Sequence, residues 1–186
     1  MARKRNVIAL ILIVSACVST QKGDDEWITL FNGTDLNDWI VKIHHHDAGV
    51  NFGNTFRAEG GLVLAGLGDG KSRPTGNMCS PGTEIVYNGQ IYDGHCLNSS
   101  SRTFDKDKWV KAELIVHGDS AITHIIEGDT VLQYSKPTIG GGVVQGYDST
   151  LWHPGRPLKS GFIALQSEGQ PIDFRNIQLK ILCEAQ

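Results

Sequence analysis

The fold class is decided by residues 161–180, GFIALQSEGQPIDFRNIQLK, because this stretch holds two strand patterns separated by a turn. Residues 161–166 are largely apolar on both alternating faces, which is typical of a strand buried between two layers. Residues 174–181 alternate more cleanly and have one apolar face. Gly169-Gln170-Pro171 predicts the turn between them. We therefore expect a β-hairpin near the end of the chain.

Composition agrees with a single all-β domain. The chain has 186 residues, of which 40% are hydrophobic, so it can bury a core of its own. Its 22 glycines and the scarcity of helical periodicity after the N-terminus indicate many short strands joined by tight turns. A net charge of -3 gives no reason to expect a nucleic-acid partner.

Other strand patterns lie upstream. Two hairpins are expected, one joining 55–58 to 62–64 and one joining 84–87 to 90–92 through Asn88-Gly89. A meander is expected from the alternation in 109–117, 121–126 and 130–134, and shorter strands are expected at 27–31 and 39–43.

The N-terminus has the pattern of a lipoprotein export signal. Residues 1–16 combine a basic start, an apolar run too short for a permanent membrane span, and small residues before Cys17. We expect lipidation at Cys17, a flexible tether over 17–26 and the folded domain over 27–182, on the periplasmic or extracellular face of the cell envelope. The alternative is an ordinary secretory signal in which Cys17 is incidental.

Three cysteines remain in the domain. Cys79 and Cys96 lie in one loop-rich region, so the expected arrangement is one bridge between them with Cys183 free. A loop of that length is worth about 3 kcal/mol in the chain-entropy model. Spacing alone does not exclude three unpaired thiols.

Several motifs together resemble a known family. They are Leu30-Phe-Asn-Gly33 with Leu36 and Trp39, Asn51-Phe-Gly-Asn-Thr-Phe-Arg57, Trp109 opening a strand, and residues 161–166 followed by Phe174-Arg-Asn-Ile177. The stretch from Trp27 to about Leu182 resembles the 3-keto-disaccharide hydrolase domain family, DUF1080. The resemblance implies a concanavalin A-like jelly-roll β-sandwich in an exported bacterial protein that acts on sugars, with some members cleaving 3-keto-glycosides. The region from Asn77 to Cys96 resembles a subgroup of this family, which favours the bridge.

The chain also departs from the family pattern. Family members usually place further strands before the Pro-Gly-Thr region, whereas here Leu64 is followed closely by Asn77. Part of one sheet is then missing, and the sandwich is expected to expose a strand edge or to be completed by a partner. A truncated, inactive member of the family would have the same sequence features.

Glu168 and Arg175 are the expected catalytic pair. Across a hairpin, an arginine could keep a carboxylate ionised and orient it as a general acid or base, with Gln166 beside them as a substrate contact. The alternative is a structural ion pair at a sheet end. Family members often carry a histidine in this turn, so the family's roles are not transferred to Glu168.

Histidines and one tryptophan are further candidates for substrate contact. Consecutive histidines on an extended chain point to opposite faces, so at most His44 and His46 could share an ion, and we expect no metal site. His45, His46 and Trp152 are the candidate substrate contacts, the last by stacking on a sugar ring; the simpler interpretations are a solvated loop for the histidines and core packing for the tryptophan.

Two functions from different classes follow. The first is a lipid-anchored hydrolase or lyase acting on 3-keto-glycosides or related glycosides. The second is a carbohydrate-binding or scaffold module without chemistry. The chain has no paired-carboxylate strand of the sandwich glucanases and no Walker or dinucleotide motif, so no cofactor is expected.

Overall fold

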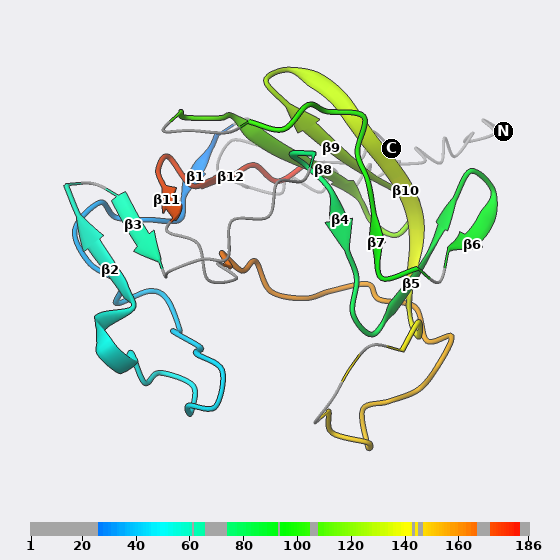
Figure 1. Ribbon diagram of the computed structural model, residues 1–186, viewed down its shortest axis with the longest axis horizontal. Coiled ribbons are helices and arrows are strands. Elements are labelled where there is room, and N and C mark those ends of the chain that lie inside the picture. The colour runs from blue at the N-terminus through cyan, green and yellow to red at the C-terminus, as the bar shows by residue number, and fades with distance from the viewer. Residues whose placement is uncertain are drawn as a thin grey trace, which may run out of the picture.

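The computed structural model describes residues 26–60, 62–65, 74–92, 94–104, 108–142, 144, 147–166 and 172–182. The described chain is all-β and consists of short antiparallel strands, with a 3-10 turn, η1 (Phe52–Asn54) (Figure 1). This confirms the expected fold class and agrees with a sandwich architecture. None of the helical segments in these ranges has the length and apolar character needed to cross a membrane.

The largest sheet has five strands in the order β6-β5-β10-β9-β8. Their bounds are β5 (Thr83–Tyr87), β6 (Gln90–Tyr92), β8 (Ala112–His117), β9 (Ala121–Ile126) and β10 (Asp129–Ile139). The hairpin and the meander expected from the sequence are thereby confirmed. β10 is irregular against both neighbours, between Thr130 and Leu132 on one side and between Ser135 and Thr138 on the other. These irregularities bend the longest strand of the sheet.

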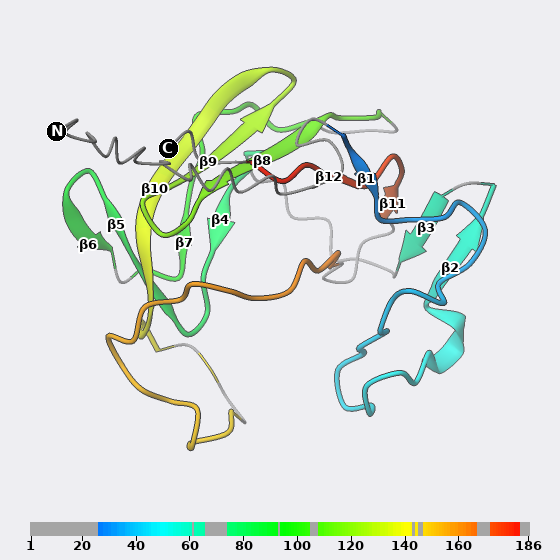
Figure 2. The same ribbon diagram turned by 180° about the vertical axis from the view of Figure 1, so that it is seen from behind.

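One face of this sheet carries the apolar core. Met78, Ile85 and Leu132 are buried against one another, and Tyr87, Tyr92, Leu97 and Tyr134 pack around them. Met78 and Leu97 do not come from the sheet. They belong to a two-stranded ribbon, β4 (Met78–Cys79) and β7 (Cys96–Leu97), which lies over it (Figure 2).

A disulfide joins the two strands of the ribbon. Cys79 and Cys96 are directly opposite in register, and their sulfur atoms are 2.02 Å apart. This is the pairing expected from the sequence, whereas Cys183 lies outside the described residues. Because the cysteines are 17 positions apart, the bridge constrains the unfolded chain by about 3 kcal/mol.

The remaining strands pair N-terminal segments of the domain with C-terminal ones. β1 (Ile28–Thr29) pairs with β12 (Gln178–Leu179), and β3 (Leu62–Ala65) lies between β2 (Phe56–Glu59) and β11 (Ile172–Phe174). The expected hairpin of β2 and β3 is confirmed. In Figure 1 this hairpin and η1 lie on one side of the molecule and the large sheet on the other, with β1, β11 and β12 between them.

The expected strand at 161–166 is wrong. This segment is in no sheet, and Phe162 and Ile163 are 103% and 56% exposed. A sequence with alternating side chains forms a strand only where a neighbouring strand supplies hydrogen bonds and a layer covers each apolar face. Among the described residues, no strand pairs with this segment.

Two other expected strands also differ. The pattern over 174–181 is divided between β11 and β12, because Asn176 adopts a positive φ of 53° that interrupts an extended backbone. The segment 39–43 forms no strand, and Ile40 is 81% exposed for the same lack of a pairing neighbour.

We predict that Gly76→Ala destabilises the domain more than Gly89→Ala. Both glycines have similar positive φ values, 84° and 77°, so the backbone strain of alanine, about 1–2 kcal/mol, is common to both. A Cβ at Gly76 would lie 2.9 Å from Cγ1 of Ile126 and 3.1 Å from Cγ2 of Val131, whereas a Cβ at Gly89 meets nothing within 4 Å. Overpacking should add about 1–3 kcal/mol at Gly76. Urea unfolding measures both variants, and equal losses would contradict the close packing at Gly76.

Candidate functional site

A turn after β1 is built on one asparagine. The Oδ1 atom of Asn32 accepts hydrogen bonds from the backbone N–H groups of Thr34 and Asp35, at 2.8 and 3.0 Å, and from the Thr34 hydroxyl at 3.0 Å. Its Nδ2 donates to Oδ1 of Asp35 at 2.9 Å. Gly33 has a φ of 83°, which the turn requires and glycine adopts without strain. The turn therefore fixes Asp35 in place.

Asp35 is held as a carboxylate. The backbone N–H of Asn37 donates to its Oδ1 at 3.0 Å, and the side chain of Asn32 donates to the same atom. These hydrogen bonds, that of Asn37 first, lower the pKa of Asp35 below its ordinary value. The side chain consequently stays ionised to a more acidic pH than an ordinary aspartate.

A second pair of charges lies on β2. Arg57 and Glu59 are two positions apart on the strand, so their side chains share one face. Nε of Arg57 donates to Oε1 of Glu59 at 2.7 Å, with both side chains in contact with solvent. The start of β2 is fixed by Asn51, whose amide donates to the carbonyl of Phe56 at 2.5 Å and accepts from its N–H at 3.1 Å.

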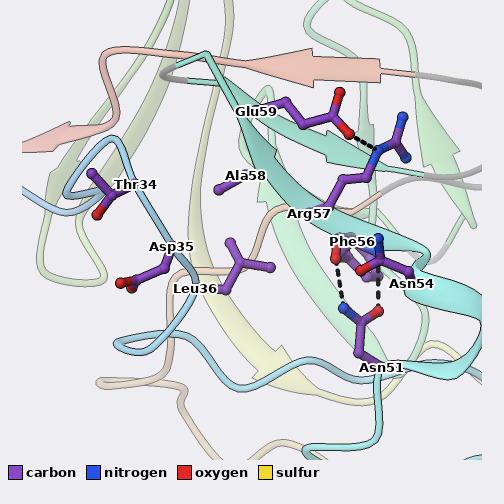
Figure 3. A pocket seen from close by; sticks show the side chains of 9 residues that line it. All are labelled: Thr34, Asp35, Leu36, Asn51, Asn54, Phe56, Arg57, Ala58 and Glu59. Carbon is purple, nitrogen blue, oxygen red and sulfur yellow. Dashed lines mark hydrogen bonds and ion pairs between the residues drawn. The ribbon is translucent and has the colours of Figure 1, made fainter.

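These two elements enclose a pocket of about 390 Å³. Its walls are the turn at 34–36 and strand β2, with the residues around η1 at one end (Figure 3). The lining residues are Thr34, Asp35, Leu36, Asn51, Asn54, Phe56, Arg57, Ala58 and Glu59. These residues carry two carboxylates, a guanidinium, two amides and a hydroxyl, and Figure 3 shows Ala58 and Leu36 between the turn and β2 while the Arg57 and Glu59 side chains extend away from the turn. Such a set can donate to and accept from the hydroxyl groups of a polar ligand.

A second hollow, of about 530 Å³, has no charged lining. It lies beside β5 and β10 and is lined by Tyr87, Asn88, Asn98, Ser99, Ser100, Thr130, Val131, Leu132 and Gln133. Amides and hydroxyls dominate here, but no carboxylate or base is available for chemistry among these residues.

The expected catalytic pair is described only in part. Glu168 lies outside the described residues, so its distance from Arg175 is not given by the structure. The guanidinium carbon of Arg175 lies 3.9 Å from the ring centroid of Trp109, an aromatic partner that the sequence did not indicate. Gln166 is exposed at the end of the irregular segment 161–166.

The histidines do not lie on an extended chain as expected. Residues 44–46 form a turn with a φ of 63° at His45, so the rings of His44 and His45 are adjacent, with centroids 3.8 Å apart. The ring of His46 stacks on Phe52, with centroids 4.4 Å apart. This stack ties the histidine turn to η1, at one end of the pocket. In the described part of the chain, no group of histidine, cysteine and acidic side chains could hold a metal ion.

Trp152 has an aromatic neighbour. Its ring and that of Tyr147 lie 4.7 Å apart at 33°, and Trp152 is partly buried while Tyr147 is exposed. The pair belongs to the loop after β10, and neither residue lines the pocket at β2.

Sequence reasoning did not identify Asp35, Asn51, Arg57 or Glu59 as site residues. One signal was available, because Arg57 and Glu59 are opposite charges at alternate positions of a predicted strand. The proximity of β2 to the turn at 34–36 depends on the tertiary fold, so local sequence patterns do not predict it.

A family model described as the 3-keto-alpha-glucoside-1,2-lyase-like domain matches residues 71–180. The chain belongs to this family. No curated protein and no solved structure matches it. The family suggests a carbohydrate-active domain, which agrees with the resemblance noted in the sequence.

The pocket at β2 precedes the stretch that matches the lyase-like family, but it is structurally joined to it. β11 and β12 fall inside 71–180, and they pair with β3 and β1, which fall outside it. Residues 28–65 are therefore part of the same β-structure as the matched stretch.

Proposed function

We propose that this chain is a carbohydrate-processing protein that binds a 3-keto-glycoside in the pocket at β2 and cleaves it by elimination or hydrolysis. The observation that carries the proposal is the set of charged residues around the pocket, with the ionised Asp35 on the turn and Arg57 and Glu59 on β2. The family description supplies the substrate class, a 3-keto-glucoside. Carboxylates and a guanidinium are suited to sugar hydroxyls and to a carbonyl oxygen.

The ketone determines which chemistry is needed. A carbonyl at C3 of the sugar makes the hydrogen on C2 acidic, so a carboxylate can remove it as a general base. The electron pair then forms a double bond between C1 and C2 as the C1–O bond breaks. The departing oxygen takes up a proton from water and leaves as an alcohol. Addition of water to the same double bond would turn this elimination into net hydrolysis.

Residues of the pocket can be assigned to proton abstraction, to charge stabilisation and to binding. Glu59 is the proposed base for the C2 proton. Arg57, beside it, would stabilise the negative charge that develops on the ketone oxygen. Asp35, held ionised by its turn, would accept hydrogen bonds from two neighbouring sugar hydroxyls.

Glu168 and Arg175 remain a second proposed catalytic pair. Arg175 directly follows β11, which pairs with β3, and β3 pairs with the pocket strand β2. Arg175 therefore directly follows a strand of the sheet that also contains β2, with β3 between the two strands. His45, His46, Gln166 and Trp152 remain proposed substrate contacts.

A non-catalytic carbohydrate-binding module is the second candidate function. The observation in its favour is exposure, because the side chains of Arg57 and Glu59 are 41% and 61% accessible. Electrostatic catalysis is strongest where water is excluded, and an open pocket provides little of that exclusion.

We predict that Glu59→Gln abolishes turnover of a 3-keto-glycoside while changing its binding by less than about threefold, since glutamine keeps the shape and loses the base. Asp35→Asn should instead weaken binding about tenfold, because it removes a charged acceptor of hydrogen bonds. Release of the alcohol, followed beside calorimetric titration of the same sugar, separates the two effects.

Asp129→Asn is the matched control, since Asp129 is an exposed carboxylate at the start of β10 and does not line the pocket. Binding without turnover by the unaltered protein would establish the module instead of the enzyme. Unchanged binding and turnover in both pocket variants would remove this pocket and leave Glu168 with Arg175 as the site.

We also propose that the protein is exported and anchored to a membrane of the cell envelope through lipid on Cys17. The order of basic start, apolar run and small residues before Cys17 supports this, together with a disulfide, which persists in an oxidising compartment.

The anchor predicts that the full chain enters the detergent phase of a cloud-point extraction and takes up labelled fatty acid. Cys17→Ser should abolish both, because the thiol is the site of attachment, while Cys183→Ser should retain them. Uptake of label by the Cys17→Ser variant, or a water-soluble wild-type chain with an unmodified Cys17, would contradict the anchor.

A further inference from the structure

β8 is an outer strand of the five-stranded sheet, and its free edge has a defined set of backbone groups. The N–H of Glu127 donates to the carbonyl of Lys111 at 3.0 Å, so the odd-numbered residues of β8 direct their peptide groups toward β9. The peptide groups of Ala112, Leu114 and Val116 consequently point outward. Among the described residues, no strand pairs with this side of β8.

The apolar face of the sheet is uncovered at the same edge. Ile122 and Ile126 on β9 are 7% and 5% exposed, whereas Leu114 and Val116 on the same face of β8 are 61% and 47% exposed. The cover that buries β9 therefore does not extend over β8. Residues 112–117 also contain no proline, a residue by which outer strands avoid pairing.

We propose that β8 pairs antiparallel with β8 of a second copy of this chain, across a twofold axis at Ile115. In this register Glu113 lies opposite His117 of the second copy, and Lys111 lies toward Asp119 of the second copy. Each contact occurs twice by symmetry, so four pairs of complementary groups line one face of the joined sheet. A carboxylate directly opposite a histidine ring can accept a hydrogen bond from it, and Lys111 contacts Glu113 within its own chain.

The other registers lack this complementarity. Outward peptide groups belong to even-numbered residues, so the next permitted axes lie at Leu114 and at Glu113. An axis at Leu114 places Lys111 opposite His117 of the second copy, two basic residues. An axis at Glu113 places the two Glu113 carboxylates opposite each other, which is repulsive.

The same register joins the apolar faces. Leu114 lies opposite Val116 of the second copy, so the exposed apolar side chains of the two chains contact each other side by side. The two five-stranded sheets become one continuous sheet, and the edge left open in each domain is closed. A closed, isologous contact of this kind yields a dimer and not a fibre.

Sedimentation velocity tests the proposal. The sample is the full chain, solubilised in mild detergent, and the variants exchange Glu113 and His117 for residues of other charge. The wild type should sediment as a dimer at micromolar concentration. Glu113→Lys should weaken the dimer about tenfold, because it removes the carboxylate opposite His117 at both symmetric positions and places a lysine there. Adding His117→Glu to that variant should restore the dimer, since it exchanges the charges.

A cross-link tests the register. Ile115→Cys should form a dimer cross-link, because side-by-side residues on the axis lie about 4.5 Å apart, within the range of a disulfide. Leu114→Cys is the matched control and should not cross-link to itself. A monomeric wild type, a double charge variant no tighter than Glu113→Lys, or cross-linking at Leu114→Cys instead of Ile115→Cys would each overturn the proposal. A thermal midpoint for every variant identifies a loss of folding.

Discussion

The structure depends on covering one apolar face of its largest sheet. The cover is a ribbon of two short strands, and Met78 from that ribbon packs on Ile85 and Leu132 of the sheet. Two strands of two residues each would not be stable alone, so the Cys79–Cys96 disulfide is needed to hold them together. Burial of these side chains is worth about 1.5–3 kcal/mol each, comparable with the bridge itself.

Polar contacts fix the position of the cover. Nδ1 of His124 on β9 lies 2.8 Å from the carbonyl of Gly76, and its Nε2 lies 3.2 Å from the hydroxyl of Tyr134 on β10. A carbonyl only accepts, so Nδ1 donates to the carbonyl of Gly76. Burial raises the pKa of Tyr134, which keeps that hydroxyl protonated. On the other strand of the ribbon, the N–H of Ser99 donates to Asn77 at 2.8 Å.

The sequence indicates local structure well and long-range pairing poorly. Asn88-Gly89 predicts its hairpin because the turn requires positive φ at both positions, and these residues adopt 50° and 77°. Residues 161–166 have an equally clear pattern but find no neighbouring strand. The pocket shows the same limit, since Asp35 and Glu59 lie on a turn and a strand that are brought together only by the tertiary fold. The family could be identified because its motifs are read residue by residue.

The role of the disulfide-bonded ribbon, β4 and β7, is tested most directly by hydrogen exchange. The measurement compares the wild type with the Cys79→Ala/Cys96→Ala variant. If the ribbon stabilises the sheet, the amides of β9 and β10 should lose about 3 kcal/mol of protection in the variant, together with β4 and β7. The β2–β3 hairpin, which lies away from the ribbon, should lose less. Unchanged protection in β9 and β10, with loss confined to β4 and β7, would contradict the claim that this cover holds the sheet.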